Sequence, residues 1–104
     1  MSGYEDLSSR LTDKRSDVTF IFWRVGKLAF IKAEGNTVAL TAGWNVLATI
    51  PSGYRPPSWM YGFGMANELG AMCETSVTSY GAVRVYSGKS ATGLVRLSLV
   101  FPMA

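Results

Sequence analysis

"NVLATIPSGYRPPSWMYGFG", residues 45–64, joins two apolar runs through a corner rich in glycine and proline. Pro51 has no amide hydrogen for a strand ladder, so the first run ends there. Gly53 can adopt a positive φ without steric cost. Pro56 restricts Arg55 to extended conformations, which makes the corner stiff. The corner is therefore predicted to turn the chain at one sheet edge and to start the next strand.

Short apolar and aromatic runs on both sides of this corner predict an all-β domain. Gly, Pro, Ser or Asn separates the runs at near-regular intervals, which is typical of a sandwich. We expect a small antiparallel β-sandwich, jelly-roll-like, of about eight strands, with a turn at Gly35-Asn36. The expected strands cover residues 18–25, 28–34, 37–40, 44–50, 58–65, 71–77, 82–87 and 94–101.

Alternation along three of these runs predicts which side of each strand is buried. In the last run, Val95, Leu97, Leu99 and Phe101 share one face, and in residues 82–87 two valines oppose Arg84 and Tyr86. These strands should have one buried face. The run 18–25 is apolar on both faces, so it either contacts a neighbouring subunit or is packed on both sides by its own chain.

The N-terminal residues predict a short helix followed by the β-structure. Ser2 and Glu5 match a capping box, and Tyr4, Leu7 and Leu11 form a narrow apolar stripe at helical spacing. Residues 3–15 are therefore expected to be helical. Residues 1–17 are expected to form a short stem that bundles with identical copies, and residues 18–104 are expected to form the β-sandwich domain. A frayed leader is the alternative to the stem.

The composition suggests that identical copies cover part of the surface. Of the 104 residues, 48% are hydrophobic and only 16% are charged, against about 25% charged in a typical soluble domain. A chain this short has little material to cover two faces of a sheet. We therefore expect other copies of the chain to cover the remaining apolar surface. The expected interface residues are Tyr4, Leu7, Leu11, Phe20 and Phe22.

Several kinds of chemistry have no support in the sequence. The chain has no histidine and a single cysteine, Cys73, which we interpret as a buried small hydrophobic residue. We expect no enzymatic activity, no metal and no cofactor. No apolar run is long enough for a membrane helix, and the polar N-terminus does not resemble a signal peptide, so synthesis in a cytoplasm without membrane insertion is expected. The basic residues are scattered, so nucleic-acid binding is not expected.

Four segments together carry a resemblance to a known family. They are "RVGKLAFI" (24–31), "GWNVLATIPSGYRPP" (43–57), "YGAVRVYS" (80–87) and "GLVRLSLVFPMA" (93–104). The chain resembles the C-terminal head domains of tailed-bacteriophage tail-fibre, baseplate and receptor-binding proteins. The resemblance implies a trimer in the virion tail or baseplate, attached to other tail proteins. It also implies a stem before the head and contact with the host surface, often with saccharides.

The candidate ligand-binding residues follow from how proteins hold sugars. Aromatic rings stack on the C–H surfaces of a sugar, and Asn, Glu or Arg bonds its hydroxyl groups. For Trp59, the alternative role is packing in the core. For Arg84 and Tyr86, the alternatives are trimer contacts or a solvated face, and residues 67–68 are alternatively a simple turn. A structural assembly module without a ligand, and a single-strand nucleic-acid-binding fold, are the alternative functions. The candidate residues are Trp59, Tyr61, Asn67, Glu68, Arg84 and Tyr86.

Overall fold

The computed structural model describes residues 4–67 and 71–104, apart from the side chain of Asn67. This part of the chain is all-β, with one short 3-10 helix, η1 (Ser8–Arg10), and no α-helix. The prediction of an all-β chain is confirmed. The strands are β1 (Tyr4–Asp6), β2 (Thr19–Val25), β3 (Leu28–Leu40), β4 (Gly43–Thr49), β5 (Met60–Asn67), β6 (Ala71–Val77), β7 (Ala82–Ser87) and β8 (Ala91–Pro102). Eight strands are present in this part of the chain, but β1 was not predicted and the expected strands 28–34 and 37–40 form the single strand β3.

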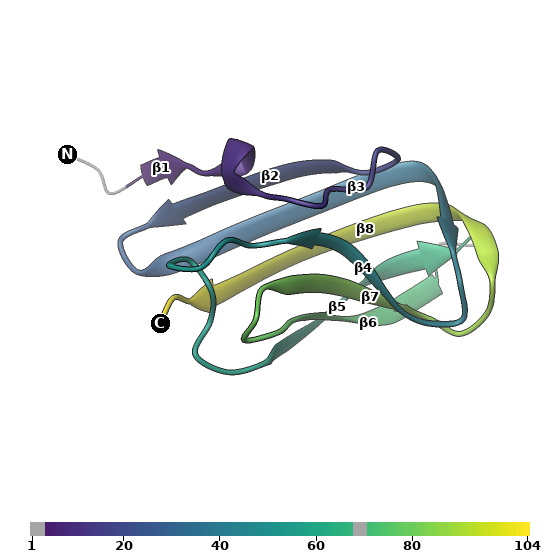
Figure 1. The fold of residues 1–104 in the computed structure, drawn as a ribbon. Coiled ribbons are helices and arrows are strands. Elements are labelled where there is room, and N and C mark those ends of the chain that lie inside the picture. The colour runs from purple at the N-terminus through teal and green to yellow at the C-terminus, as the bar shows by residue number, and fades with distance from the viewer. Residues whose placement is uncertain (1–3, 68–70) are drawn as a thin grey trace.

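The strands form one continuous antiparallel sheet in the order β1-β2-β3-β8-β5-β6-β7-β4. The sheet is curled, with β2, β3 and β8 on one side and β5, β6 and β7 on the other (Figure 1). The two sides stay joined because residues 64–67 of β5 pair with residues 94–97 of β8. The expected sandwich of two separate sheets, jelly-roll-like in topology, is therefore not confirmed.

One hydrophobic cluster fills the inside of the curled sheet and takes side chains from β2 through β8. Every second residue of β8 points into it, from Val95 to Phe101, and none of these four is more than 7% exposed. Val83 and Val85 of β7 are fully buried, opposite the partly buried Arg84 and the exposed Tyr86. The alternation in these two strands was therefore predicted correctly, and it fixes which side chains remain outside.

The helix expected over residues 3–15 is not present. Leu7 donates its amide to the carbonyl of Phe22 in β2 at 2.7 Å, and Thr12 exchanges backbone hydrogen bonds with Thr49 in β4 at 3.0 and 2.8 Å. The segment thus crosses from β2 to β4 and covers the β4 edge, which would otherwise expose unpaired backbone groups. Leu7 and Leu11 are buried beneath this crossing. The spacing that resembled a helix comes from their packing into the core, so residues 4–18 are not a separate stem.

The turn expected at Gly35-Asn36 is also wrong, because β3 runs without a break from Leu28 to Leu40. The register between β3 and β8 shifts between Gly35 and Val38, as in a β-bulge. A Cβ on Gly35 would lie 2.5 Å from both the Asp17 carbonyl oxygen and the Val38 side chain. Glycine is therefore required here for close packing within a bent strand.

Candidate functional site

The Arg84 side chain lies against two tryptophans on the outer face of the sheet. Its guanidinium carbon is 4.3 Å from the ring centroid of Trp44 and 4.7 Å from that of Trp59. Trp44 belongs to β4, whose Val46 is directly opposite Arg84 of β7, and Trp59 immediately precedes β5. Both contacts are within the range of cation–π attraction. Three segments distant in sequence thus build one rigid group.

A hydrogen bond to Ser76 of β6 fixes the position of the guanidinium. The Nε–H of Arg84 donates to the Ser76 hydroxyl at 3.0 Å, and Ser76 is fully buried although its strand neighbours Tyr61 and Glu74 are exposed. Ser76 is the register partner of both Tyr61 and Arg84, so the three side chains lie in a row across β5, β6 and β7. This row sets the position of Arg84 relative to the aromatic residues around it.

Further rings extend the group on both sides. Tyr80 meets Trp59 edge-on at a centroid distance of 5.9 Å, and Tyr86 meets Trp44 in the same way at 5.4 Å. On β5, Tyr61 is 57% exposed and Phe63 is 72% exposed. We name these six rings the aromatic platform; its members are Trp44, Trp59, Tyr61, Phe63, Tyr80 and Tyr86.

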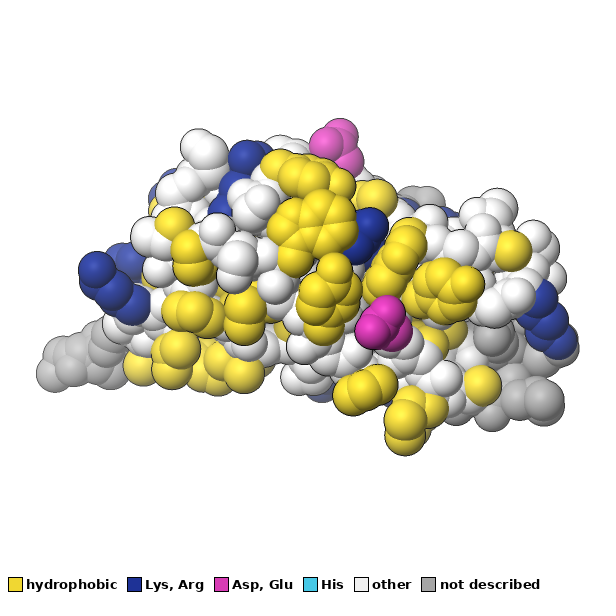
Figure 2. Space-filling model, turned by 90° about the horizontal axis from the view of Figure 1, so that it is seen from below, with side chains coloured by type: hydrophobic (Ala, Val, Ile, Leu, Met, Phe, Trp, Pro, Cys, Tyr) yellow, Lys and Arg dark blue, Asp and Glu magenta, His cyan; other side chains and the backbone are white. Residues whose placement is uncertain are grey.

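The platform lies on the side of the molecule that Figure 2 shows, over β5, β6 and β7. Hydrophobic side chains gather there with few charged groups among them (Figure 2). Aromatic rings carry partial negative charge on their faces, which attracts the polarised C–H groups of a sugar ring. Hydroxyl groups of the same sugar can accept hydrogen bonds from Arg84. The arrangement is therefore suited to an extended, partly polar ligand that lies flat on the surface.

The glycine–proline corner positions Trp59. Gly53 has a φ of +98°, as predicted, and Arg55 donates its Nε–H to the Ile50 carbonyl at 2.7 Å. Ile50 donates its amide to the carbonyl of Gly81 at 2.8 Å. A Cβ on Gly81 would collide with the Ile50 carbonyl oxygen, so glycine permits this contact. The corner is thereby fastened to the β6–β7 turn that carries Tyr80.

Of the six candidate ligand-binding residues, the structure brings four together: Trp59, Tyr61, Arg84 and Tyr86. Trp59 is 42% exposed, so its alternative role in the core does not hold. Asn67 ends β5 and pairs with Leu94 at the far end of that strand, and its side chain lies outside the described part. Glu68 lies outside the described residues.

Sequence reasoning missed three members of the platform: Trp44, Tyr80 and Phe63. Trp44 and Val46 face outward while Asn45 and Leu47 are buried, so the polar and apolar residues of this run gave no signal for the outward face. Asn45 lies under the β3–β4 turn, where its amide group bonds to both the amide and the carbonyl of Thr41. Tyr80 is in a turn, where alternation gives no signal.

The proposed interface residues do not form a common surface. Leu7, Leu11 and Phe22 are buried in the core of the chain itself, and Phe20 packs partly against that core. These four side chains therefore leave little or no area for a partner, and only Tyr4 is largely exposed, at 58%.

The outward face of β2 is apolar and open, so β2 is not packed on both sides by its own chain. Trp23 stacks on Phe30 of β3 at a centroid distance of 5.2 Å. Around this pair lies a group of residues that are each 46–58% exposed. We name it the apolar stripe; its members are Tyr4, Ile21, Val25, Leu28 and Val100.

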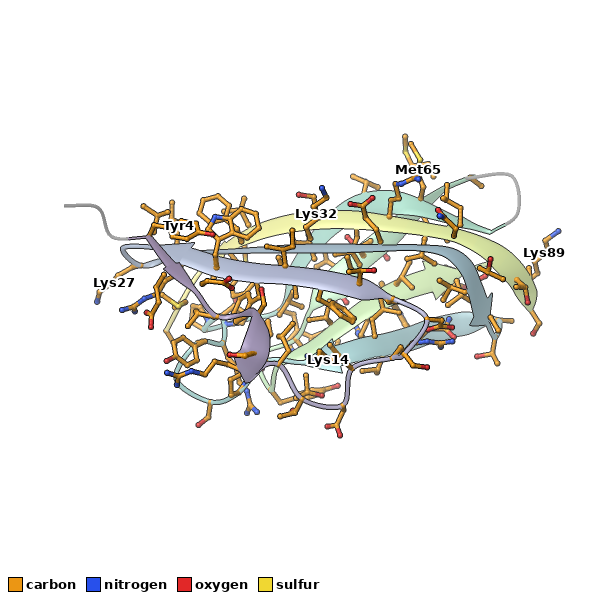
Figure 3. The ribbon with its side chains drawn as sticks, turned by 90° about the horizontal axis from the view of Figure 1, so that it is seen from above. Tyr4, Lys14, Lys27, Lys32, Met65 and Lys89 are labelled. Carbon is orange, nitrogen blue, oxygen red and sulfur yellow. The ribbon has the colours of Figure 1, made fainter. Side chains whose placement is uncertain are left out.

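A cluster of charged residues lies beside the apolar stripe, because Lys32 of β3 is the register partner of Ile21. Glu34 of β3 contacts Lys32 at 3.0 Å and Arg96 of β8 at 3.5 Å. These two cations lower the pKa of the Glu34 carboxyl group. Tyr4, Lys32 and Met65 project from the same side of the molecule (Figure 3).

Cys73 lies half-buried in β6 and packs against the hydrophobic core. Burial raises the pKa of its thiol, so the nucleophilic thiolate is disfavoured at neutral pH. Within residues 4–67 and 71–104, no three His, Cys, Asp or Glu residues are grouped as metal ligands would be. The same residues contain no helix of the length and apolar character needed to cross a membrane.

Comparison with known proteins does not assign the chain to a family. No protein-family model matches the sequence, and no curated protein matches it. The features that bear on its function are therefore the geometry of the platform and the sequence resemblance.

Proposed function

We propose that this chain is a saccharide-binding head domain of a bacteriophage tail fibre or tail tip, which recognises the host cell surface. The observation that carries the proposal is the aromatic platform, in which six rings and Arg84 are held on one exposed face. Soluble domains rarely leave so many large rings together in water unless a partner covers them. A sugar chain uses both features of this face, because its C–H groups stack on rings and its hydroxyl groups bond to polar side chains.

The location on a virion rests on the resemblance to phage head domains. The segments that carry it include the corner at residues 50–57, which fastens Trp59 and Tyr80 into the platform. In this proposal the chain is a homotrimer attached to other tail proteins, and the platform contacts the host saccharide. No cofactor takes part.

A glycan array with matched tryptophan variants tests the proposal. Trp59→Ala and Trp44→Ala remove rings from the platform, whereas Trp23→Ala removes a ring of similar size that stacks on Phe30 away from it. We expect saturable binding by the wild type, a loss of about tenfold or more in the platform variants, and unchanged binding in Trp23→Ala. No binding to any glycan or host cell wall by a folded wild type would refute the proposal.

The apolar stripe favours a second candidate function, that of an assembly module of a virion tail. Ile21, Val25 and Val100 are each about half exposed on the outward face of β2 and β8. Covering them with identical copies would remove apolar area from water. Light scattering should then show a trimer, and Val25→Lys should reduce its mass. A monomer at all concentrations would count against this module.

A further inference from the structure

Within residues 4–67 and 71–104, Arg84 has no carboxylate partner, whereas three other arginines do. Arg15 pairs with Asp17 at 2.8 Å, Arg24 with Glu5 at 2.9 Å and Arg96 with Glu34 at 3.5 Å. Among the described residues, no acidic side chain lies within ion-pair distance of Arg84. Its position is instead fixed by Trp44, Trp59 and Ser76, which hold the cation without neutralising it. The platform therefore presents a guanidinium that is held in position and forms no ion pair with a described carboxylate.

The contacts of the guanidinium also decide which ligand atoms can reach it. One indole comes from β4 and the other from the residue before β5, and their centroids lie 4.3 and 4.7 Å from the guanidinium carbon. The Nε–H is used by Ser76. No described residue accepts a hydrogen bond from either terminal nitrogen of Arg84. These nitrogens present parallel N–H groups, which match the two oxygens of a carboxylate in a planar, bidentate pair.

We propose that the platform selects saccharides that carry a carboxylate, such as uronic-acid units, over their neutral counterparts. The carboxylate of the sugar pairs with the terminal nitrogens of Arg84, and the sugar ring lies on the neighbouring aromatic rings. This inference rests on the proposed saccharide binding and assigns the chemical class of the ligand. The cation–π contacts keep the guanidinium in place before the ligand arrives, so little side-chain entropy is lost on binding.

The test compares matched ligands and matched variants. The probes are oligosaccharides of glucuronic acid and the same oligosaccharides after reduction of each carboxyl group to a hydroxymethyl group, together with an array of other acidic and neutral glycans. Arg84→Gln removes the charge, and Arg84→Lys keeps it without the bidentate geometry. Arg10→Gln is the control, because Arg10 also lies on a ring, that of Tyr54, away from the platform. Affinity is measured by calorimetry at low and physiological salt.

We expect the wild type and Arg10→Gln to bind the acidic form about tenfold more tightly than the reduced form, with a preference that weakens as salt rises. Arg84→Gln should weaken binding of both forms and bind the two about equally, and Arg84→Lys should lose most of the preference for the acidic form. Equal binding of both forms by the wild type overturns this inference and leaves saccharide binding intact. Binding of no glycan in the panel, acidic or neutral, overturns the proposed function itself.

Discussion

Arg55 donates a hydrogen bond of 2.7 Å to the carbonyl of Ile50, and this bond joins the two ends of the corner between β4 and β5. The same two residues lie against Gly81 in the β6–β7 turn, where a side chain would collide with the Ile50 carbonyl oxygen. The corner and the turn each carry one ring of the platform, Trp59 and Tyr80. This hydrogen bond therefore connects the stiffest part of the sequence to the proposed binding face.

Removing this hydrogen bond should destabilise the fold. In Arg55→Ala the carbonyl of the buried Ile50 loses its charged donor, and we expect the free energy of unfolding to fall by about 1–3 kcal/mol. Urea denaturation followed by tryptophan fluorescence measures the change. Arg10→Ala, which removes an exposed arginine beside Tyr54, should stay within about 0.5 kcal/mol of the wild type. Equal stability of all three proteins would mean that the corner holds its shape without Arg55.

A second prediction concerns Gly64, where β5 passes close to β8. A Cβ at this position would collide with the Arg96 carbonyl oxygen, and the Thr75 methyl group would be 3.0 Å away. Because backbone cannot move aside cheaply, Gly64→Ala should cost about 1–3 kcal/mol of stability. Gly88→Ala is the matched control, since nothing lies within 4 Å of a Cβ there. Thermal unfolding that lowers the Tm of both variants equally would contradict this packing.

The stability of the N-terminal crossing should depend on pH through Asp17. Arg15 donates to both carboxylate oxygens of Asp17, at 2.9 and 2.8 Å, and lowers the pKa of this carboxyl below 3.8 in the folded chain. A lowered pKa stabilises the fold above pH 3.8, and that stabilisation is lost as the pH falls through the folded value. We expect the Tm of Asp17→Asn to lie below that of the wild type at pH 7. The gap should shrink below pH 4, and a gap independent of pH would refute the pairing.

Glu74 should weaken the binding of an acidic saccharide. It is exposed on β6, two residues from Ser76 on the same face and opposite Phe63. Two residues of a strand span about 7 Å, so its charge repels a carboxylate bound at Arg84 through water. Glu74→Gln should tighten binding of glucuronic-acid oligosaccharides about twofold at low salt and leave their reduced forms unaffected. Glu5→Gln, on β1, removes the same charge away from the platform and is the control. An equal gain of affinity in Glu5→Gln would show that the effect comes from net charge and not from the position of Glu74.

Alternation predicted the buried faces of β7 and β8 because each inward side chain meets the core of its own sheet. The prediction of an N-terminal helix was wrong because this segment is held by residues far away in the sequence. Leu7 and Leu11 are spaced as in a helix, but hydrogen bonds to Phe22 and Thr49 outweigh the weak preference of a short segment for helix. Local sequence does not contain these partners, since they lie 15 and 37 residues further along the chain.

The candidate site was predictable only where its residues lie on strands. Tyr61, Arg84 and Tyr86 follow from alternation within β5 and β7, and the corner places Trp59 next to them. The neighbourhood of Trp44 and Arg84 depends on the pairing of β4 with β7, strands that are separated by two others in the sequence. Such long-range pairing is set by the whole sheet. The bulge at Gly35 also depends on pairing with a distant strand, β8, so the local sequence Gly35-Asn36 predicted a turn instead.

The three tryptophans give the most direct test of where a saccharide binds, because two lie on the platform and Trp23 lies beside the apolar stripe. Each indole N–H gives its own signal in an NMR spectrum of the ¹⁵N-labelled protein. During titration with glucuronic-acid oligosaccharides, the signals of Trp44 and Trp59 should shift in a saturable way while that of Trp23 stays in place. A shift of Trp23 alone, or no shift of any indole at millimolar saccharide, would contradict binding at the aromatic platform.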